Sequence, residues 1–347
     1  MVALQKVRFY GLLMTLVAAV SLAAISIGST RVEWGTSVQV IAAKLLPFWF
    51  SLGDVSHADQ VIVWLIRVPR VVVAAFVGGG LAVAGVLMQG LFRNPLAEPN
   101  IVGVGSGAVL GAVIVFTSGL ALRFVLALPL AAFAGALFAL AVVYALANRG
   151  GTTPISTLLL SGIALAALLS AISSLLISLS IVNFNVAEEI VFWMMGGLDS
   201  RSWTHVWVSG PFIVLAVAVS LYYGRDLDLL VQGEETAAAL GVDVEASKRM
   251  LIVVSALLTG SCVAVAGVIG FVGLIVPHVA RLVVGPSHRP LLISSALAGA
   301  AFLIVCDLLA RTLRPPTEIR LGIITAAFGA PFFLLLLVRK YREVSLP

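Results

Sequence analysis

Long apolar runs follow one another along almost the whole chain, with short polar turns between them. Many reach about 20 residues, the length a helix needs to cross a hydrocarbon core roughly 30 Å thick. The pattern therefore predicts an all-α integral membrane protein with about ten transmembrane helices. The expected crossings are residues 8–28, 61–90, 99–118, 121–147, 155–181, 205–223, 247–270, 271–285, 290–311 and 319–338. The eighth is short enough to be a half-helix.

The composition excludes a soluble protein. Of 347 residues, 61% are hydrophobic and 11% are charged, too few charges to cover a soluble domain of this size. The run from Phe9 to Ile27 resembles a signal peptide but lacks a convincing cleavage site, so we expect a retained helix. Cys262 and Cys306 lie in apolar runs, where buried free thiols are expected. We expect residues 1–347 to form one transmembrane domain.

Charge at the two chain ends predicts the topology. An even number of crossings puts both ends on one side, and positively charged ends favour the cytoplasm. The basic residues near the ends are Lys6, Arg8, Arg339, Lys340 and Arg342. Over the whole chain the bias is weak, because several arginines fall on the outer side: Arg67, Arg70, Arg311, Arg314 and Arg320. The net charge of +5 forms no basic stripe that would indicate nucleic-acid binding.

A recurring pentapeptide suggests an internal repeat. The pentapeptide at 82–86 recurs at 264–268, and a proline follows nine residues later in both copies, at Pro95 and Pro277. Five crossings separate the copies, so they would run in opposite directions, as in the inverted repeats of transporters. Chance matches are common in a chain so rich in Ala, Val and Gly. The glycines Gly103, Gly107 and Gly111 share one helical face and favour close packing between helices.

Two polar segments interrupt the apolar pattern. Residues 29–60 form a long loop with Trp34 and the aromatic cluster 48–50, a composition typical of a membrane interface. Residues 224–248 are the longest soluble stretch. They predict a short helix, a glycine break and a second short helix on the cytoplasmic side.

No sequence motif for covalent chemistry is visible. The chain has no Gly-x4-Gly-Lys-Ser/Thr phosphate loop and no His-Glu-x-x-His zinc site, and no Ser-His-Asp set can be argued. We therefore expect no enzyme, and any energy for transport has to come from a partner. The histidines are expected to form hydrogen bonds rather than a metal site.

One carboxylate lies inside an apolar run. Asp307 could act as a proton-relay group, in which case the protein would be an ion-driven secondary transporter. Its spacing from Arg311 equally fits a local ion pair across one helical turn, and we favour the pair.

Five motifs in order along the chain carry a family resemblance. They are Arg67-Val-Pro-Arg70, Gln89 with residues 93–99 (RNPLAEP), Gly233-Glu234-Glu235 with 240–242 (LGV), residues 267–278 (GVIGFVGLIVPH) with Arg281, and Thr325 with 329–331 (GAP). As an ordered set they resemble the FecCD-type permease subunits of binding-protein-dependent ABC importers for iron-siderophores, haem and vitamin B12. One position departs from that pattern, because Arg320 stands where the family usually has proline.

The resemblance implies a type II ABC importer permease fold in the bacterial inner membrane. It implies a homodimer with two cytoplasmic ATPase subunits and a periplasmic substrate-binding protein. ATP would bind the ATPase subunits, and no permanent cofactor is expected. The residues implied to couple to the ATPase are Gly233, Glu234, Glu235, Leu240 and Gly241. Those implied to receive acidic residues of the binding protein are Arg67, Arg70 and Arg311.

The transported compound is only weakly indicated. Residues 148–154 and 94–99 look most like the haem-importing branch, so haem or another iron chelate is expected, with a corrinoid such as vitamin B12 as the alternative. These positions are expected to face the cytoplasm, so the inference rests on similarity to that branch and not on the chemistry of a binding site.

The fifth crossing is a candidate wall of the transport path, together with the last crossing. It carries no charge and has hydroxyls at Ser161, Ser170, Ser173 and Ser174. Serines in helices also commonly bond to their own backbone, and the sequence leaves both interpretations open.

Overall fold

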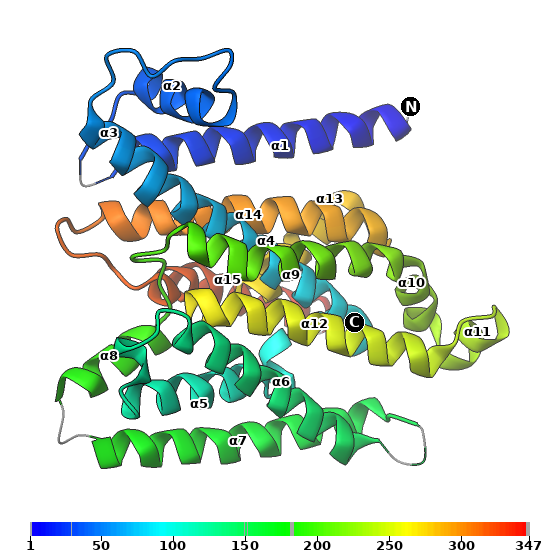
Figure 1. Cartoon of the computed structure of the whole chain (residues 1–347). Helices are drawn as coiled ribbons and strands as arrows, with labels where there is room; N and C mark the ends of the chain where they lie inside the picture. Colours follow the sequence, from blue (N-terminus) through cyan, green and yellow to red (C-terminus); the bar gives the residue numbers. More distant parts are fainter. Residues whose placement is uncertain (1, 29, 149, 151, 181–183, 345–347) are drawn as a thin grey trace.

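The computed structural model describes residues 2–28, 30–148, 150, 152–180 and 184–344 (Figure 1). Within them, seven helical stretches are long and apolar enough to cross a membrane. They are α1 (Val2–Ser26), the continuous stretch His57–Leu91 that ends in α4 (Val68–Leu91), α6 (Ala127–Ala147), α7 (Ile155–Ser180), α9 (Trp203–Tyr222), α12 (Val244–Ala266) and α14 (His288–Thr312). Three further apolar helices complete the predicted ten: the shorter α5 (Val104–Thr117) and α13 (Val272–Val284), and α15 (Leu321–Val344), which is apolar over Leu321–Leu335.

Shorter elements lie at the two ends of the bundle. The outer end carries α2 (Trp34–Leu45), α3 (His57–Val61), the π-helical turn η1 (Ile62–Arg67), η3 (Leu120–Leu122) and α8 (Phe184–Met194). The opposite, inner end carries α10 (Gly224–Gln232) and α11 (Glu234–Ala239), which extend beyond the other helices (Figure 1). The predicted pair of short helices in 224–248 is confirmed. α8 was not predicted, since it lies between two expected crossings.

The core is built around α4, whose residues are almost all buried. It packs against α14, α12, α13 and α9. Its crossing with α14 depends on two glycines, since a Cβ on Gly78 would lie 2.2 Å from the carbonyl oxygen of Gly299. A membrane offers little hydrophobic drive for helix association, so such close backbone contact is a main source of packing energy.

A second cluster joins α5, α6 and α7. Gly107 meets Gly135 of α6, and a Cβ on Gly111 would lie 2.1 Å from the carbonyl oxygen of Ala131. The glycine face predicted from the sequence therefore packs helices within the subunit.

The two halves of the chain share an inverted pattern. α4 and α12 run in opposite directions (Figure 1), and each is followed by an irregular stretch and a short helix, α5 or α13. The irregular stretch after α4 meets the start of α13 inside the bundle: Pro99 of η2 (Pro99–Val102) lies against Gly273, and Gly273 in turn lies against α4 at Gly85. Non-helical backbone at this depth is tolerated because it is buried in protein. Gln89 of α4 donates to the carbonyl of Gly273 at 3.2 Å, which satisfies one freed group.

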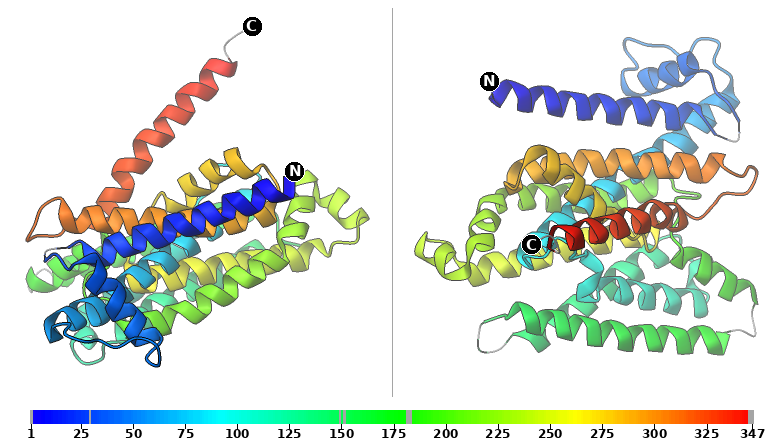
Figure 2. Two further views of the ribbon diagram at one scale, coloured as in Figure 1. Left: turned by 90° about the horizontal axis from the view of Figure 1, so that it is seen from above. Right: turned by 180° about the vertical axis from the view of Figure 1, so that it is seen from behind.

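The last helix leaves the bundle. Figure 2 shows α15 diverging from the other helices, anchored mainly at its outer end. Several of its large apolar side chains are half exposed or more, namely Ile323, Phe328, Leu334, Leu335 and Val338. The described part of α15 therefore has an apolar face that the subunit itself does not cover.

Candidate functional site

Two of the predicted docking arginines bond within the subunit. Arg67 donates to the carbonyls of Ile25 and Ser26 at 2.7 and 2.9 Å, and Arg311 donates to Ala24 at 2.9 Å. Both thus cap the carboxyl end of α1, where backbone carbonyls lack helical partners and the helix dipole favours a cation.

The third docking arginine is central to a charged cluster. Arg70 donates to Asp307 at 2.8–3.1 Å and to Glu318 at 2.7 and 3.0 Å. Asp307 also lies 3.1 Å from Nε of Arg311, which confirms the predicted Asp307–Arg311 pair. The side chain of Asp307 is only 2% exposed, so this carboxylate is shared by two buried cations.

The three arginines that the family resemblance assigns to docking are largely covered by the subunit itself. Arg67, Arg70 and Arg311 are only 4–8% exposed. Each finds carbonyl or carboxylate acceptors inside the subunit because a buried guanidinium without partners would be costly. The outer arginines that weaken the positive-inside bias therefore have internal hydrogen-bond partners.

The predicted coupling segment is tied firmly to the bundle. Asp228 of α10 accepts from the ring nitrogen Nδ1 of His288 at 2.6 Å and from its backbone N–H at 2.8 Å. Asp226 accepts from the hydroxyl of Ser247 at 2.9 Å. The segment is thus held by the first turns of both α14 and α12.

The two glutamates of the coupling segment differ in environment. Glu234 pairs with Lys248 at 3.1 Å, and Lys248 is buried and also bonds to Glu245. Glu235 is exposed. Gly233 and Gly241 both have positive φ, +142° and +85°, a backbone conformation that favours glycine. Leu240, which precedes Gly241 in the sequence, is 61% exposed. The tip around Glu235 and Leu240 is therefore the part available to a partner.

The serines of α7 do not share one environment. Ser173 is buried and donates to the carbonyl of Leu169 at 2.8 Å, the internal bonding left open as the alternative. Ser170 and Ser174 are exposed, and Ser161 is half-buried. α7 lies at the edge of the subunit (Figure 1).

A hollow lies beside α15. It has a volume of about 540 Å³ and an almost wholly apolar wall. We call it the apolar hollow; its lining residues are Met194, Met195, Val268, Gly270, Phe271, Gly322, Ile323, Ala326 and Ala327. The start of α15, which belongs to the last crossing, forms one wall of this hollow. The other walls come from the end of α8 and the irregular stretch 267–271, which the sequence did not indicate.

Backbone hydrogen bonds fix these walls to one another. The N–H of Gly197 donates to Ala266 at 2.9 Å, and the N–H groups of Leu321 and Gly322 donate to Gly196 and Met195 at 3.1 and 3.0 Å. Gly196 and Gly267 both have φ near +70°, and a Cβ on Gly267 would lie 2.2 Å from the carbonyl of Trp193. The ends of α8, α12 and α15 therefore form one rigid junction.

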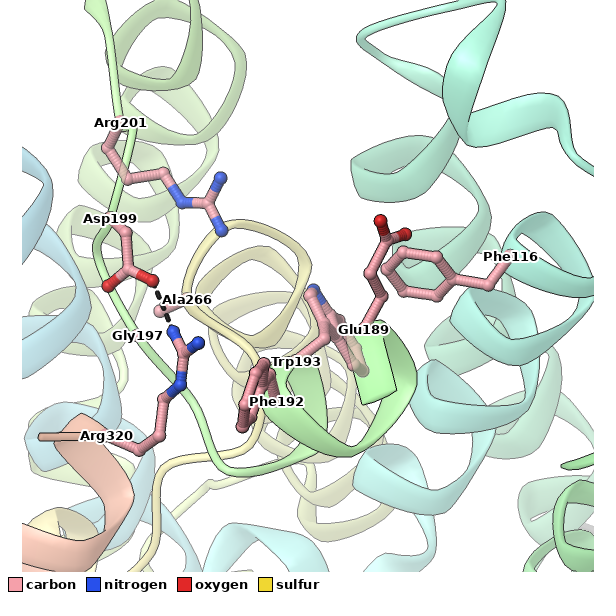
Figure 3. A pocket seen from close by; sticks show the side chains of 9 residues that line it. All are labelled: Phe116, Glu189, Phe192, Trp193, Gly197, Asp199, Arg201, Ala266 and Arg320. Atoms are coloured by element: carbon pink, nitrogen blue, oxygen red, sulfur yellow. Dashed lines mark hydrogen bonds and ion pairs between the residues drawn. The ribbon is translucent and has the colours of Figure 1, made fainter. Parts of the chain in front are cut away.

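A smaller, more polar pocket lies on the outer side of this junction (Figure 3). We call it the outer pocket. Its volume is about 230 Å³, and its lining includes Phe116, Glu189, Phe192, Trp193, Asp199, Arg201 and Arg320. Burial lowers the pKa of Arg201; Asp199 opposes this shift and Arg70 adds to it.

Arg320, the departure from the family pattern, builds one wall of the outer pocket. Its guanidinium pairs with Asp199 and lies 4.2 Å from the ring centroid of Phe192. This combination of ion pair and cation–π contact holds the start of α15 against α8. The sequence could single out Arg320 but not its partners, which lie over a hundred residues away.

No group of three or more His, Cys, Asp or Glu side chains in the described ranges is placed to hold a metal ion. Cys262 and Cys306 are both buried and unpaired, as expected.

Comparisons with known proteins agree with this architecture. The model of the FecCD transport family matches residues 15–339. The chain is 50% identical to the cobalamin import system permease protein BtuC of Halobacterium salinarum, over 84% of this chain and 76% of that protein. It is 41% identical to the hemin transport system permease protein HmuU of Yersinia pestis, over 82% and 85%.

A solved structure has the same fold. It is described as an inward-facing conformation of a metal-chelate type ABC transporter, is 31% identical, and superposes with a TM-score of 0.83 over 96% of this chain and 99% of that one. The family match covers nearly the whole length, including both irregular stretches and residues 224–248. This chain therefore belongs to the FecCD transport family.

Proposed function

We propose that the protein is the permease subunit of an ATP-driven importer that moves haem or another iron chelate from the periplasm to the cytoplasm of a bacterium, across the inner membrane. The apolar hollow is the observation that carries this proposal. A wall of methionine, phenylalanine and small residues suits a bulky, partly apolar chelate, because it offers contact area without fixed charges that would retain the cargo. The family match supports transport by an ABC permease.

The functional unit is a homodimer. The uncovered apolar face of α15 supports this part of the proposal, since a second copy related by a two-fold axis would bury the same face on both subunits. The two apolar hollows would then share one central path, with the exposed α7 positions Ser170 and Ser174 as candidate wall residues.

Two cytoplasmic ATPase subunits supply the energy. The tip of α10–α11, with Glu235 and Leu240 exposed, is the proposed contact, and Gly233, Glu234 and Gly241 set its shape. Because the segment is tied to α12 and α14, movement of the tip would be transmitted to the bundle.

A periplasmic binding protein delivers the cargo, and Arg67, Arg70 and Arg311 remain the proposed docking residues. Of the three, Arg70 has the partner that is easiest to replace, because the side chain of Glu318 is 34% exposed. A carboxylate of the binding protein could take the place of Glu318 and keep the guanidinium paired.

A corrinoid importer is the second candidate. The 50% identity to a cobalamin import permease favours it. Both candidates are tested by uptake into proteoliposomes that contain the permease, its ATPase and its binding protein. ATP-dependent uptake of haem but not cyanocobalamin supports the proposal, and the reverse result assigns the corrinoid. Uptake that needs a proton gradient and no ATP would contradict both.

A further inference from the structure

We propose that the outer pocket binds one oxyanion arm of a flat, largely apolar ligand, with Arg201 and Trp193 as donors. That this ligand is the transported chelate rests on the proposed function. The pocket itself is argued below from its side chains alone.

Two buried donors in the outer pocket have no acceptor. Trp193 is 8% exposed, and neither its indole nitrogen nor Nε of Arg201 has a hydrogen-bond partner. Figure 3 shows both side chains directed into the same hollow from different walls. Buried donors in folded proteins are nearly always paired, so two of them at one hollow indicate an acceptor that enters it.

His205, the neighbour of Arg201, does not supply the missing acceptor. A terminal nitrogen of Arg201 lies 3.4 Å from Nε2 of His205, while Nδ1 of the same ring accepts from the backbone N–H of Ser202. A neutral imidazole with Nδ1 as acceptor carries its proton on Nε2. Nε2 is then a donor and cannot accept from Arg201.

The charges of the lining residues set the valence of the ligand. Asp199 is paired with Arg320, so Arg201 is the lining cation without a carboxylate partner. Glu189 lines the exposed side of the pocket and would repel a second negative group. One anionic group is therefore the expected occupant, held by charge-assisted hydrogen bonds.

The volume indicates how much of a ligand enters. About 230 Å³ corresponds to roughly eight water molecules, enough for an acidic side arm and an adjoining ring edge, but not a whole porphyrin or corrin. Phe116 and Phe192 supply aromatic contacts for that edge. The outer pocket and the apolar hollow share no lining residue, so the rest of the ligand would lie outside the outer pocket, on the side where Glu189 is exposed.

Two arms share this chemistry: a carboxylate of haem and the phosphodiester of cobalamin. The test measures binding of four probes to the permease–ATPase complex in nanodiscs: haem, haem dimethyl ester, cyanocobalamin and the small aromatic anion 2-naphthoate. The variants are Arg201→Gln and Trp193→Phe, and the matched control is Arg123→Gln, an exposed arginine directly after η3 that does not line the pocket. Basal ATPase activity and thermal unfolding verify that each complex is intact.

Binding of the recognised anion should weaken roughly ten- to a hundredfold in Arg201→Gln, by less in Trp193→Phe, and not at all in the control. If that anion is haem, its dimethyl ester should bind the wild type as weakly as haem binds Arg201→Gln. Cyanocobalamin sensitive to Arg201 would support the pocket and identify the phosphodiester.

The failures are distinguishable. Naphthoate bound in an Arg201-dependent way without haem binding supports the pocket and contradicts haem as cargo. Haem bound equally by the wild type and both variants overturns the pocket and leaves haem import standing. Absence of binding by every probe overturns the pocket.

Discussion

Replacing Asp307 by alanine should destabilise the subunit far more than replacing Glu318, although both carboxylates contact Arg70. Asp307 accepts from Arg70 and lies beside Arg311, and all three side chains are at most 10% exposed. Glu318 pairs with Arg70, and its side chain is 34% exposed.

The magnitudes follow from what remains after each change. Without Asp307, two buried guanidinium groups lose their shared counter-charge, and breaking a buried pair in this way costs about 3–5 kcal/mol. Without Glu318, Arg70 keeps its bonds to Asp307 and gains access to water. That loss should be about 1 kcal/mol or less.

Thermal unfolding of the purified subunit, followed by size-exclusion chromatography, measures the difference. We expect the midpoint of Asp307→Ala to fall by roughly 5–10 °C and that of Glu318→Ala by about 2 °C or less. Asp54→Ala, which removes an exposed outer-loop carboxylate, is the control. Equal midpoints for the Asp307 and Glu318 variants would refute the reasoning.

The same residue separates two transport mechanisms. If Asp307 relayed protons, a protonophore would abolish uptake by the wild type. If it is a structural counter-ion, uptake should persist with ATP alone.

Three further outcomes are expected. Glu235→Lys should uncouple substrate-stimulated ATPase activity from transport at unchanged thermal stability. Glu234→Lys should also lower thermal stability, because it places a second cation beside Lys248. Unchanged coupling in Glu235→Lys would contradict the proposed contact. Gly78→Leu should cost about 3 kcal/mol or more, since its Cβ would meet the Gly299 backbone, while Gly11→Leu, with open space around it, should be neutral by the same unfolding assay. In a variant lacking Cys262 and Cys306, cysteines at 170 and 174 should react with a water-soluble thiol reagent and one at 173 should not; protection of all three would place the path elsewhere.

The sequence predicted the helices well because the membrane restricts the possible structures. A chain in hydrocarbon must satisfy its backbone within helices, so apolar runs map directly onto α1, α4, α6 and the other crossings. The paired helices in 224–248 were also predictable, because glycines mark the break and the end.

The site was harder to predict because its walls are joined by contacts distant in sequence. α8 is short, and the backbone bonds from Gly197 and Gly322 to distant elements leave no local periodic pattern. The outer arginines could be singled out from the sequence, but the acceptors of Arg67 and Arg70 on α1 and α14 could not, because they become neighbours only after folding.

The buried arginines also constrain how a binding protein could engage this face. Arg67 and Arg311 hold the end of α1 through carbonyl bonds, so diverting them would expose buried backbone acceptors. Arg70 bonds instead to the carboxylates of Asp307 and Glu318, and Glu318 lies on the segment that leads from α14 into α15. A carboxylate arriving at Arg70 would therefore compete with Glu318 and free the segment that precedes Arg320. Arg320 lines the outer pocket and Gly322 lines the apolar hollow. Docking at Arg70 would therefore affect both cavities, because one short stretch of chain connects Glu318 to these two residues.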